Sequence, residues 1–279
     1  MTVTTETRRP IQQLDDDTIG HIAAGEVVER PAQVVKELVE NSIDAGSNRI
    51  RVEIERGGFD RISVIDDGGG IPTDELELAV TRHATSKLAT ATDLSAIHTL
   101  GFRGEALASI GMVSELRLSS RTDDSEGMRI SVDDGAKKPL EPAGIAPGTV
   151  IEVRNLFANI PARLSFQKRP STESAAIVDI VVSQALCNPT IGFTVNIDGR
   201  NVLETPPSVE MSDRLFDLIG APAERLVSLQ CSDADTEAPG DEQWSGWISP
   251  PDLTRSKGDE IHVIINGRPV ANSPFNQAI

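Results

Sequence analysis

Three polar residues with helical spacing stand out between positions 37 and 44. Glu37 and Asn41 are four positions apart, and Asp44 follows three positions later. On a helix, side chains at this spacing project from one face. A carboxylate there can orient a water molecule, and an amide oxygen can bind a hard cation such as Mg²⁺. Taken alone, the same spacing is also typical of the solvated face of an amphipathic helix.

A second group of candidates lies at the ends of two apolar runs. Asp66 closes one run and is followed by Gly68, Gly69 and Gly70, while Thr149 opens another. Glycines let the backbone turn tightly and approach a ligand closely, and a short carboxylate can accept a hydrogen bond from an exocyclic amine. By themselves, these features fit a plain turn and an ordinary strand start equally well.

Residues 101–110 predict an anion site. Gly101 and Gly104 are three positions apart and open a helix predicted over residues 103–110. Free N–H groups and the positive end of a helix dipole favour a phosphate at such a place. A packed junction between a loop and a helix would have the same pattern.

Other kinds of chemistry are excluded by what the sequence lacks. It has no P-loop, its four histidines have no metal-binding spacing, and Ser109 lacks the flanking glycines of a nucleophile elbow. Two cysteines cannot form a disulfide framework or a Cys-rich zinc site. Covalent and zinc catalysis are therefore not expected.

The elements that must position these residues include both helices and strands. Pro31 predicts a helix start, and Gly46 predicts its end. Alternating apolar residues on either side of Gly57-Gly58 predict an antiparallel hairpin, whereas a dinucleotide-binding fold needs a parallel crossover there. The other elements predicted before residue 205 are helices starting at Thr73 and spanning 172–186, and strands at 113–121, 128–132 and 150–153.

A linker at Thr205-Pro206-Pro207 predicts two domains, over residues 11–207 and 208–279. The second domain is expected to be truncated, because the chain ends where a further helix begins. Its predicted elements are a helix at 213–219, strands at 226–230, 243–248 and 260–265, an acidic loop at 232–242 and a hairpin turn at Asn266-Gly267.

The composition predicts a soluble, intracellular globular protein. Of the 279 residues 38% are hydrophobic, no apolar stretch is long enough to span a membrane, and the polar N-terminus has no secretion signal. The formal net charge is −17, with 20 arginines and only six lysines. This acidic, lysine-poor balance favours a high-salt cytoplasm and argues against a simple basic nucleic-acid module.

Four strings are far more specific together than any single feature. They read IAAGEVVERP at 22–31, ELVENS at 37–42, RHATSK at 82–87 and GFRGEALASI at 101–110. With the segments around Asp66 and Thr149, they resemble the nucleotide-binding motifs of the split ATPase superfamily that includes gyrase, the large heat-shock chaperone and histidine kinases. Within that superfamily they resemble the mismatch-repair family MutL and its eukaryotic relatives, from about residue 11 to the C-terminus.

The resemblance implies an α+β protein of the GHKL (Bergerat-type) fold. This fold is an α/β sandwich with a mixed, largely antiparallel sheet, followed here by a partial ribosomal-S5-like βαβ domain. The implied activity is slow hydrolysis of ATP with Mg²⁺, used as a conformational switch in DNA mismatch repair. The implied partners are DNA, a MutS-type mismatch-recognition protein, a downstream nuclease or helicase, and a second copy through ATP-dependent self-association. The implied location is the cytoplasm, in association with the nucleoid and without a membrane.

The resemblance also implies roles for individual residues. Glu37 would be the catalytic general base, Asn41 would hold Mg²⁺, and Asp66 would read the adenine amine. A lid from Lys87 to Ala106 would fold over the triphosphate, and Thr149 would support the adenine. The predicted cofactor-binding residues are Asn41, Asp66, Gly68, Gly70, Thr85, Lys87, Gly101, Phe102, Arg103, Gly104, Glu105, Ala106 and Thr149.

Two arginines match family segments near a proposed DNA groove. Arg163 and Arg268 are therefore possible phosphate contacts, although a solvated surface arginine is the commoner role. Close to Arg163, Ala158 and Ile160 stand where the family usually has Tyr and Thr. This departure bears on the packing of the local loop and not on the ATP site.

Two other functions compete with a repair ATPase. The activating lysine of the family's second domain and its dimerising C-terminal region have no counterpart here, so the chain is expected to be an N-terminal fragment. A non-hydrolysing, ATP-binding interaction module of the same family is therefore an alternative. An ATPase subunit of a type II topoisomerase is another, but residues 82–87 and 101–110 argue against it.

Overall fold

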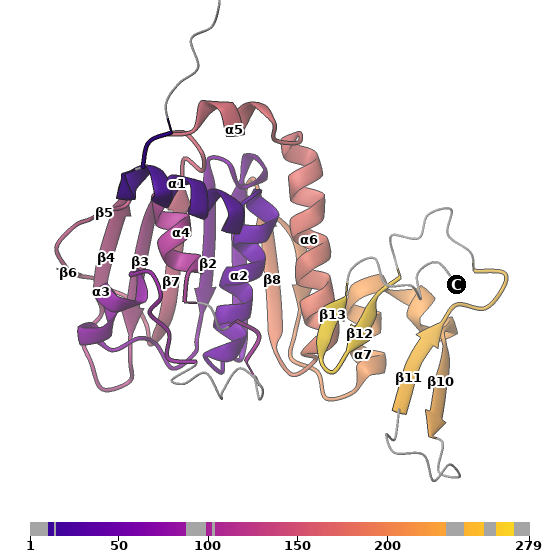
Figure 1. Cartoon of the computed structure of the whole chain (residues 1–279). Helices are drawn as coiled ribbons and strands as arrows, with labels where there is room; N and C mark the ends of the chain where they lie inside the picture. The colour runs from indigo at the N-terminus through magenta and orange to yellow at the C-terminus, as the bar shows by residue number, and fades with distance from the viewer. Residues whose placement is uncertain are drawn as a thin grey trace, which may run out of the picture.

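A mixed sheet of nine strands forms the larger part of the molecule (Figure 1). The computed structural model describes residues 11–13, 15–87, 99–101, 104–232, 243–253 and 261–270. The strand order is β5-β4-β3-β7-β2-β1-β8-β9, with β6 paired to β4. Every neighbouring pair is antiparallel except β1 and β8, which run parallel. The strands are β1 (Arg49–Glu55), β2 (Arg61–Asp66), β3 (Glu115–Arg121), β4 (Met128–Asp133), β5 (Ala136–Lys137), β6 (Glu141–Pro142), β7 (Gly148–Arg154), β8 (Gly192–Ile197) and β9 (Arg200–Thr205).

Helices cover one face of this sheet (Figure 1). Their inner faces and the sheet enclose one apolar core, to which α2 contributes Val34, Val35, Leu38 and Val39. The α+β class and the mixed, largely antiparallel sheet predicted from the sequence are thereby confirmed. The helices of this part are α1 (Asp16–Val27), α2 (Pro31–Asp44), α3 (Leu76–Ala79), α4 (Ala106–Met112), α5 (Pro161–Ser165) and α6 (Pro170–Cys187), with 3₁₀ turns η1 (Arg56–Gly58) and η2 (Thr73–Glu75).

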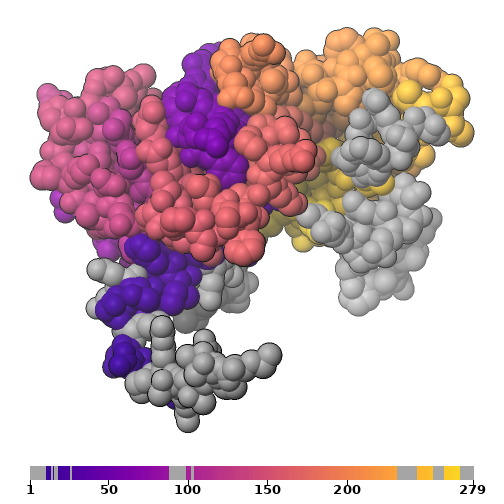
Figure 2. Space-filling view, turned by 90° about the horizontal axis from the view of Figure 1, so that it is seen from above, coloured from indigo at the N-terminus to yellow at the C-terminus, as the bar shows by residue number. Residues whose placement is uncertain are grey.

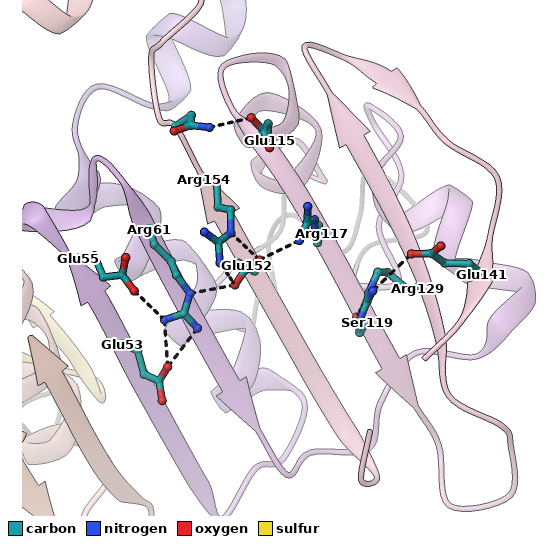
Figure 3. Close-up of polar contacts among 11 residues, drawn as sticks. Glu53, Glu55, Arg61, Glu115, Arg117, Ser119, Arg129, Glu141, Glu152 and Arg154 are labelled. Atoms are coloured by element: carbon teal, nitrogen blue, oxygen red, sulfur yellow. Dashed lines mark hydrogen bonds and ion pairs between the residues drawn. The ribbon is translucent and has the colours of Figure 1, made fainter. Parts of the chain in front are cut away.

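Charged side chains occupy the other face of the sheet (Figure 3). They alternate along each strand with core residues, as Glu152 does between Ile151 and Val153 on β7. Arg61 of β2 donates hydrogen bonds to Glu152 of β7 and to Glu53 of β1. An ion-pair network therefore crosses three neighbouring strands on this face.

The predicted helix and hairpin before residue 66 are confirmed. Helix α2 begins with Pro31 in its first turn, where proline lacks only an N–H that would be free in any case. It ends at Asp44, and Gly46, two residues later, has a φ of 74°. Strands β1 and β2 pair antiparallel, and the turn between them includes Gly57 and Gly58, both with positive φ.

The elements after residue 207 lie beside the sheet, on the side where α6 lies (Figures 1 and 2). Asn266 and Gly267 both have positive φ, which confirms the predicted hairpin turn. The described elements are α7 (Met211–Ile219), the 3₁₀ turn η4 (Ala221–Arg225), an antiparallel pair of β10 (Val227–Ser232) and β11 (Gln243–Ile248), and a hairpin of β12 (Val263–Ile265) and β13 (Arg268–Val270). The domain boundary at 207 and the S5-like arrangement stay predictions, and most of the predicted acidic loop at 232–242 lies outside the described residues.

One predicted helix begins too early, several other predicted boundaries differ by about two residues, and several observed elements were not predicted. The helix predicted to begin at residue 103 begins at Ala106, because Gly104 has a φ of 61° and cannot continue a right-handed helix. Helices α1 and α5 and strands β8 and β9 were not predicted. Among the described residues, no helix combines the length and apolar character that a bilayer crossing needs.

Candidate nucleotide-binding site

Asp66 ends β2 with its carboxylate buried and held by neutral donors. The Ser42 hydroxyl lies 2.8 Å from Oδ2, and the Gly68 backbone N–H donates to Oδ1 at 3.0 Å. The residue is 8% exposed, and burial raises the pKa of Asp66 above its ordinary value, an effect that these hydrogen bonds oppose. Within the described part of the chain, no lysine or arginine pairs with this carboxylate.

Thr149 lies directly beside Asp66, as the register of β2 and β7 pairs the two residues. Thr149 is buried, and its hydroxyl lies 3.0 Å from the hydroxyl of Ser120 on β3. Ser120 in turn accepts a hydrogen bond from the backbone N–H of Ile71 at 2.8 Å. The structure therefore brings together two predicted residues that are 83 positions apart in the chain.

The glycines after Asp66 allow close packing of the backbone. A Cβ on Gly68 would lie 2.7 Å from the Ser47 hydroxyl, closer than real Cβ atoms come to such an atom. Gly70 has a φ of 71°, and a Cβ there would clash with the carbonyl oxygen of Arg121. Both predicted positions thus require glycine on steric grounds.

Asn41 faces a positive charge contributed by the segment after α3. Lys87 Nζ lies 2.8 Å from Asn41 Oδ1 and 2.5 Å from Asp44 Oδ2. Asp44 also accepts backbone N–H groups from Leu100 at 3.0 Å and Gly101 at 3.3 Å. The predicted metal ligand and the predicted lysine are therefore in contact, with Asp44 as their common partner.

Glu37 lies one helical turn before Asn41. Its side chain is half-buried and makes no hydrogen bond or ion pair with another described residue. Its i, i+4 spacing on the continuous helix α2 places it on the same face as Asn41. A carboxylate without a partner at this position is free to bind a water molecule.

The predicted phosphate-binding segments lie against each other. A Cβ on Gly104 would clash with the carbonyl oxygen of Ala84, so the backbones of these two segments touch. The Thr85 hydroxyl accepts the backbone N–H of Lys87 at 3.1 Å. Glu105 lies just before helix α4, with a carboxylate oxygen 3.3 Å from the His83 ring. Of the other predicted residues here, Phe102 and Arg103 lie outside the described residues, as do positions 88–98 of the predicted lid.

The two arginines predicted as possible DNA contacts have partners within the chain. Arg163 donates to the carbonyl oxygen of Val28 at 3.1 Å and lies 5.6 Å from the centre of the Phe157 ring. Arg268 donates to the carbonyl oxygen of Thr99 at 2.9 Å. Neither contact tests binding to DNA, so both roles stay predictions.

Three serines at this site were not predicted to take part in it. Ser42 and Ser47 lie around Asp66, and Ser120 contacts Thr149. Asp44 was predicted on the same helix face as Asn41, but its contact with Lys87 was not predicted. The sequence contained one usable signal for this group. Ser42 follows Asn41 within the apolar side of α2, where a buried hydroxyl needs a hydrogen-bond partner.

Two family profiles match parts of the chain. The profile of histidine kinase-, DNA gyrase B- and HSP90-like ATPases matches residues 29–139, which include every predicted site residue except Thr149 and the two arginines. The profile of the C-terminal domain of DNA mismatch repair proteins matches residues 221–279. The two matches fall in the larger sheet and in the elements beside it.

Similar proteins agree with these profiles. The DNA mismatch repair protein MutL of Halobacterium salinarum is 44% identical over 271 residues, which cover 96% of this chain and 41% of that protein. MutL of Pelotomaculum thermopropionicum is 46% identical over 267 residues, which cover 95% of this chain and 43% of that protein. The chain thus spans about two-fifths of the length of these relatives.

Solved structures extend the agreement to three dimensions. The Aquifex aeolicus MutL ATPase domain complexed with ADP superposes with a TM-score of 0.71 at 30% sequence identity. The match covers 90% of this chain and 87% of that domain. The chain therefore belongs to the MutL family of DNA mismatch-repair proteins and contains the family's ATPase domain.

Proposed function

We propose that this chain binds ATP with Mg²⁺ between α2, the end of β2 and the described segments 84–87, 99–101 and 104–106, and that it hydrolyses the nucleotide slowly as a switch in mismatch repair. The observation that carries the proposal is the environment of the Asp66 side chain. Its carboxylate is buried among neutral donors, with no cation to satisfy it among the described residues. Such a group has acceptor capacity left for the exocyclic amine of a purine.

The residues around Asp66 define how the base would be read. The carboxylate accepts from the adenine amine, and the Thr149 hydroxyl supports the neighbouring edge of the ring directly or through a water molecule. A buried carboxylate that loses its hydrogen-bond donor is costly, so the site discriminates against a base without that amine. The backbone at Gly68 packs too closely against Ser47, and that at Gly70 against Arg121, for either position to carry a side chain.

The oxygen donors on α2 fit a hard cation. Asn41 Oδ1 and Asp44 Oδ2 already bind the Lys87 ammonium at 2.8 Å and 2.5 Å. In the part of the chain that the structure describes, no three His, Cys, Asp or Glu residues cluster as a metal site. The metal would therefore arrive with the nucleotide, held by Asn41 together with phosphate oxygens and water. When bound, Mg²⁺ neutralises charge on the phosphates.

Glu37 is the proposed general base. It is half-buried on the same face of α2 as Asn41, with no competing partner among the described residues. A water molecule on its carboxylate would be oriented for attack on the γ-phosphate, and phosphoryl transfer depends mainly on such positioning. Lys87, released from Asn41, would supply a positive charge to the phosphates.

Hydrolysis is tested by comparing Glu37→Ala with Glu75→Ala. Glu75 is an exposed acid on η2 whose side chain makes no hydrogen bond or ion pair with another described residue, so its replacement changes mainly the net charge. We expect Glu37→Ala to lower ATP turnover by about 100-fold or more while it binds a non-hydrolysable ATP analogue as tightly as the wild type. Turnover in Glu75→Ala should be unchanged. Equal turnover in all three proteins would exclude Glu37 as the base.

The same experiment separates the second candidate function. That second candidate is a non-hydrolysing, ATP-binding interaction module of the same family. It predicts tight binding of nucleotide with no turnover that depends on Glu37. Measurable turnover that is lost in Glu37→Ala would exclude it.

The proposed partners follow from membership of the family. They are DNA, a MutS-type protein, a downstream nuclease or helicase and a second copy of the chain. Because the chain spans about two-fifths of its relatives, each needs a direct test, such as cross-linking of the chain with and without a non-hydrolysable ATP analogue. Arg268 is the better candidate of the two for a DNA contact, because it is exposed while Arg163 is packed on Phe157.

A further inference from the structure

We propose that Arg268 is a positioning residue of the nucleotide pocket, acting through one peptide unit on Asp44 and Lys87. The proposal rests on the proposed function of this pocket, and it gives Arg268 a role separate from any contact with DNA. Arg268 belongs to the β12–β13 hairpin, whereas the pocket belongs to the larger sheet and its helices. The two are separated by 169 positions in the sequence where they touch.

The contact converges on the peptide unit between Thr99 and Leu100. Arg268 Nη2 donates to the Thr99 carbonyl oxygen at 2.9 Å. The N–H of the same peptide unit, which belongs to Leu100, donates to Asp44 Oδ1 at 3.0 Å. In a trans peptide the C=O and N–H point in opposite directions, so this unit lies between the guanidinium and the carboxylate. A positive charge on the oxygen side polarises the peptide and strengthens its N–H as a donor.

From Asp44 the contacts lead to the predicted metal ligand. The other oxygen of Asp44 binds the Lys87 ammonium at 2.5 Å and the Gly101 N–H at 3.3 Å. Lys87 also reaches Asn41 Oδ1 at 2.8 Å. The Asp44 side chain is only 9% exposed, so the pocket end of this chain of hydrogen bonds is shielded from water. Arg268 thus positions the backbone donors that hold Asp44. Asp44 in turn positions the Lys87 ammonium beside Asn41.

The hairpin is held in place by a contact independent of Arg268. His262, just before β12, has its ring Nδ1 3.2 Å from the Ser183 hydroxyl on α6, and β13 packs against the same helix. Figure 1 shows this hairpin beside α6. The guanidinium therefore reaches Thr99 from a docked element, which is what a positioning role requires.

The test measures binding of ADP with Mg²⁺ to the full chain by calorimetry. We expect Arg268→Gln to weaken binding by about three- to ten-fold, the range for loss of one charged, exposed hydrogen bond. Arg268→Lys, which keeps a charged donor, should recover most of the affinity. The matched control is Arg200→Gln, because Arg200 is an exposed β9 residue with no side-chain hydrogen bond to another described residue. It should bind like the wild type.

A double-mutant cycle tests the route. If Arg268 acts through Asp44, combining Arg268→Gln with Asp44→Asn should weaken binding by clearly less than the product of the two single effects. Independent effects that multiply would overturn the route. Binding by Arg268→Gln equal to that by Arg200→Gln would overturn the proposal itself.

Amide hydrogen exchange gives a readout that needs no nucleotide. In the free protein, Leu100 and Gly101 should exchange faster in Arg268→Gln than in Arg200→Gln, and unchanged exchange would contradict the contact. If the wild type bound no nucleotide at all, the proposed function would fail. The exchange measurement would still decide whether Arg268 orders this segment.

Discussion

Asp66 and Glu152 are carboxylates on neighbouring strands, and they face opposite sides of the sheet. Asp66 ends β2 on the side covered by the helices and accepts hydrogen bonds from neutral groups. Glu152 lies on β7 on the charged face, where Arg154 and Arg61 both donate to it (Figure 3). Burial raises the pKa of Asp66, whereas hydrogen bonds from Arg154 and Arg61 lower the pKa of Glu152 to about 2.

The difference separates an acid that accepts hydrogen bonds from neutral groups alone from one whose two oxygens both bind guanidinium groups. Glu152 has both oxygens engaged by guanidinium groups, so it has little capacity left for a ligand and contributes to folding. The hydrogen bonds to Asp66 come only from neutral groups and only partly offset the cost of burying its charge. A ligand that donates a further hydrogen bond would stabilise that charge. Strained or costly groups of this kind are typical of functional sites. The comparison predicts that the two acids respond oppositely to the same type of substitution.

The largest expected effect is on nucleotide binding in Asp66→Asn. The asparagine keeps the shape and can accept from Gly68, but its amide would turn a donor towards the donor of the adenine amine. We expect affinity for ADP with Mg²⁺ to fall by about 100-fold, because two donors would face each other in a buried site. Stability should hold or rise slightly, because a buried charge is removed. Calorimetry and urea unfolding measure the two quantities.

The matched control for this substitution is Asp60→Asn. Asp60 is an exposed acid whose carboxylate pairs with Arg56 at 3.3 Å, so both quantities should stay near those of the wild type. Retained affinity in Asp66→Asn would remove Asp66 from the base-reading role.

The second largest effect is on stability in Glu152→Gln. Gln cannot satisfy two guanidinium groups, so we expect a loss of about 1–3 kcal/mol in the free energy of unfolding with nucleotide affinity unchanged. Glu55→Gln is the control, because Glu55 lies 3.5 Å from Arg61 and is 53% exposed. Its loss should stay below about 0.5 kcal/mol. Equal effects of the two substitutions would show that the network has no buried centre.

The sequence predicted one of these two acids and not the other, for a physical reason. Asp66 sits at the junction of an alternating run and a glycine turn, and both features are local. The hairpin of β1 and β2 was predictable on the same grounds. Glu152 and Arg61 are 91 positions apart and meet only because β7 lies next to β2 in the sheet, between β2 and β3. No local pattern in the sequence reveals this strand order. Spacing alone could likewise place Asp44 beside Asn41 on α2 but could not bring Leu100 or Lys87 to it.

The dependence of stability on pH should also have opposite signs at the two acids. Because the pKa of Glu152 is lowered, its contribution is present above the ordinary value of 4.5 and is lost as pH falls towards about 2. The penalty of Glu152→Gln should therefore shrink over that range. The pKa of Asp66 is raised, so its ionised form costs stability at neutral pH, and that cost falls as pH drops from the raised value and is gone below the ordinary value of 3.8. Urea unfolding at a series of acidic pH values compares each variant with the wild type, and parallel curves would contradict the assignment of both groups.

The smallest expected effect is that of salt on the stability penalty of Glu152→Gln. The net charge of −17 makes the folded chain repel itself at low salt, so potassium chloride at about 1 M, where the screening length is only about 3 Å, should raise the melting temperature. The ion pair of Arg61 and Glu152 has an N–O distance of 2.9 Å and side chains that are 19% and 17% exposed, so mobile ions hardly enter it. The penalty of Glu152→Gln should therefore change by less than about 0.5 kcal/mol between low and molar salt. If the penalty of Glu152→Gln vanished in molar salt, the network would be no stronger than ordinary surface ion pairs. If the melting temperature of the wild type fell in molar salt, the predicted adaptation to a high-salt cytoplasm would be contradicted.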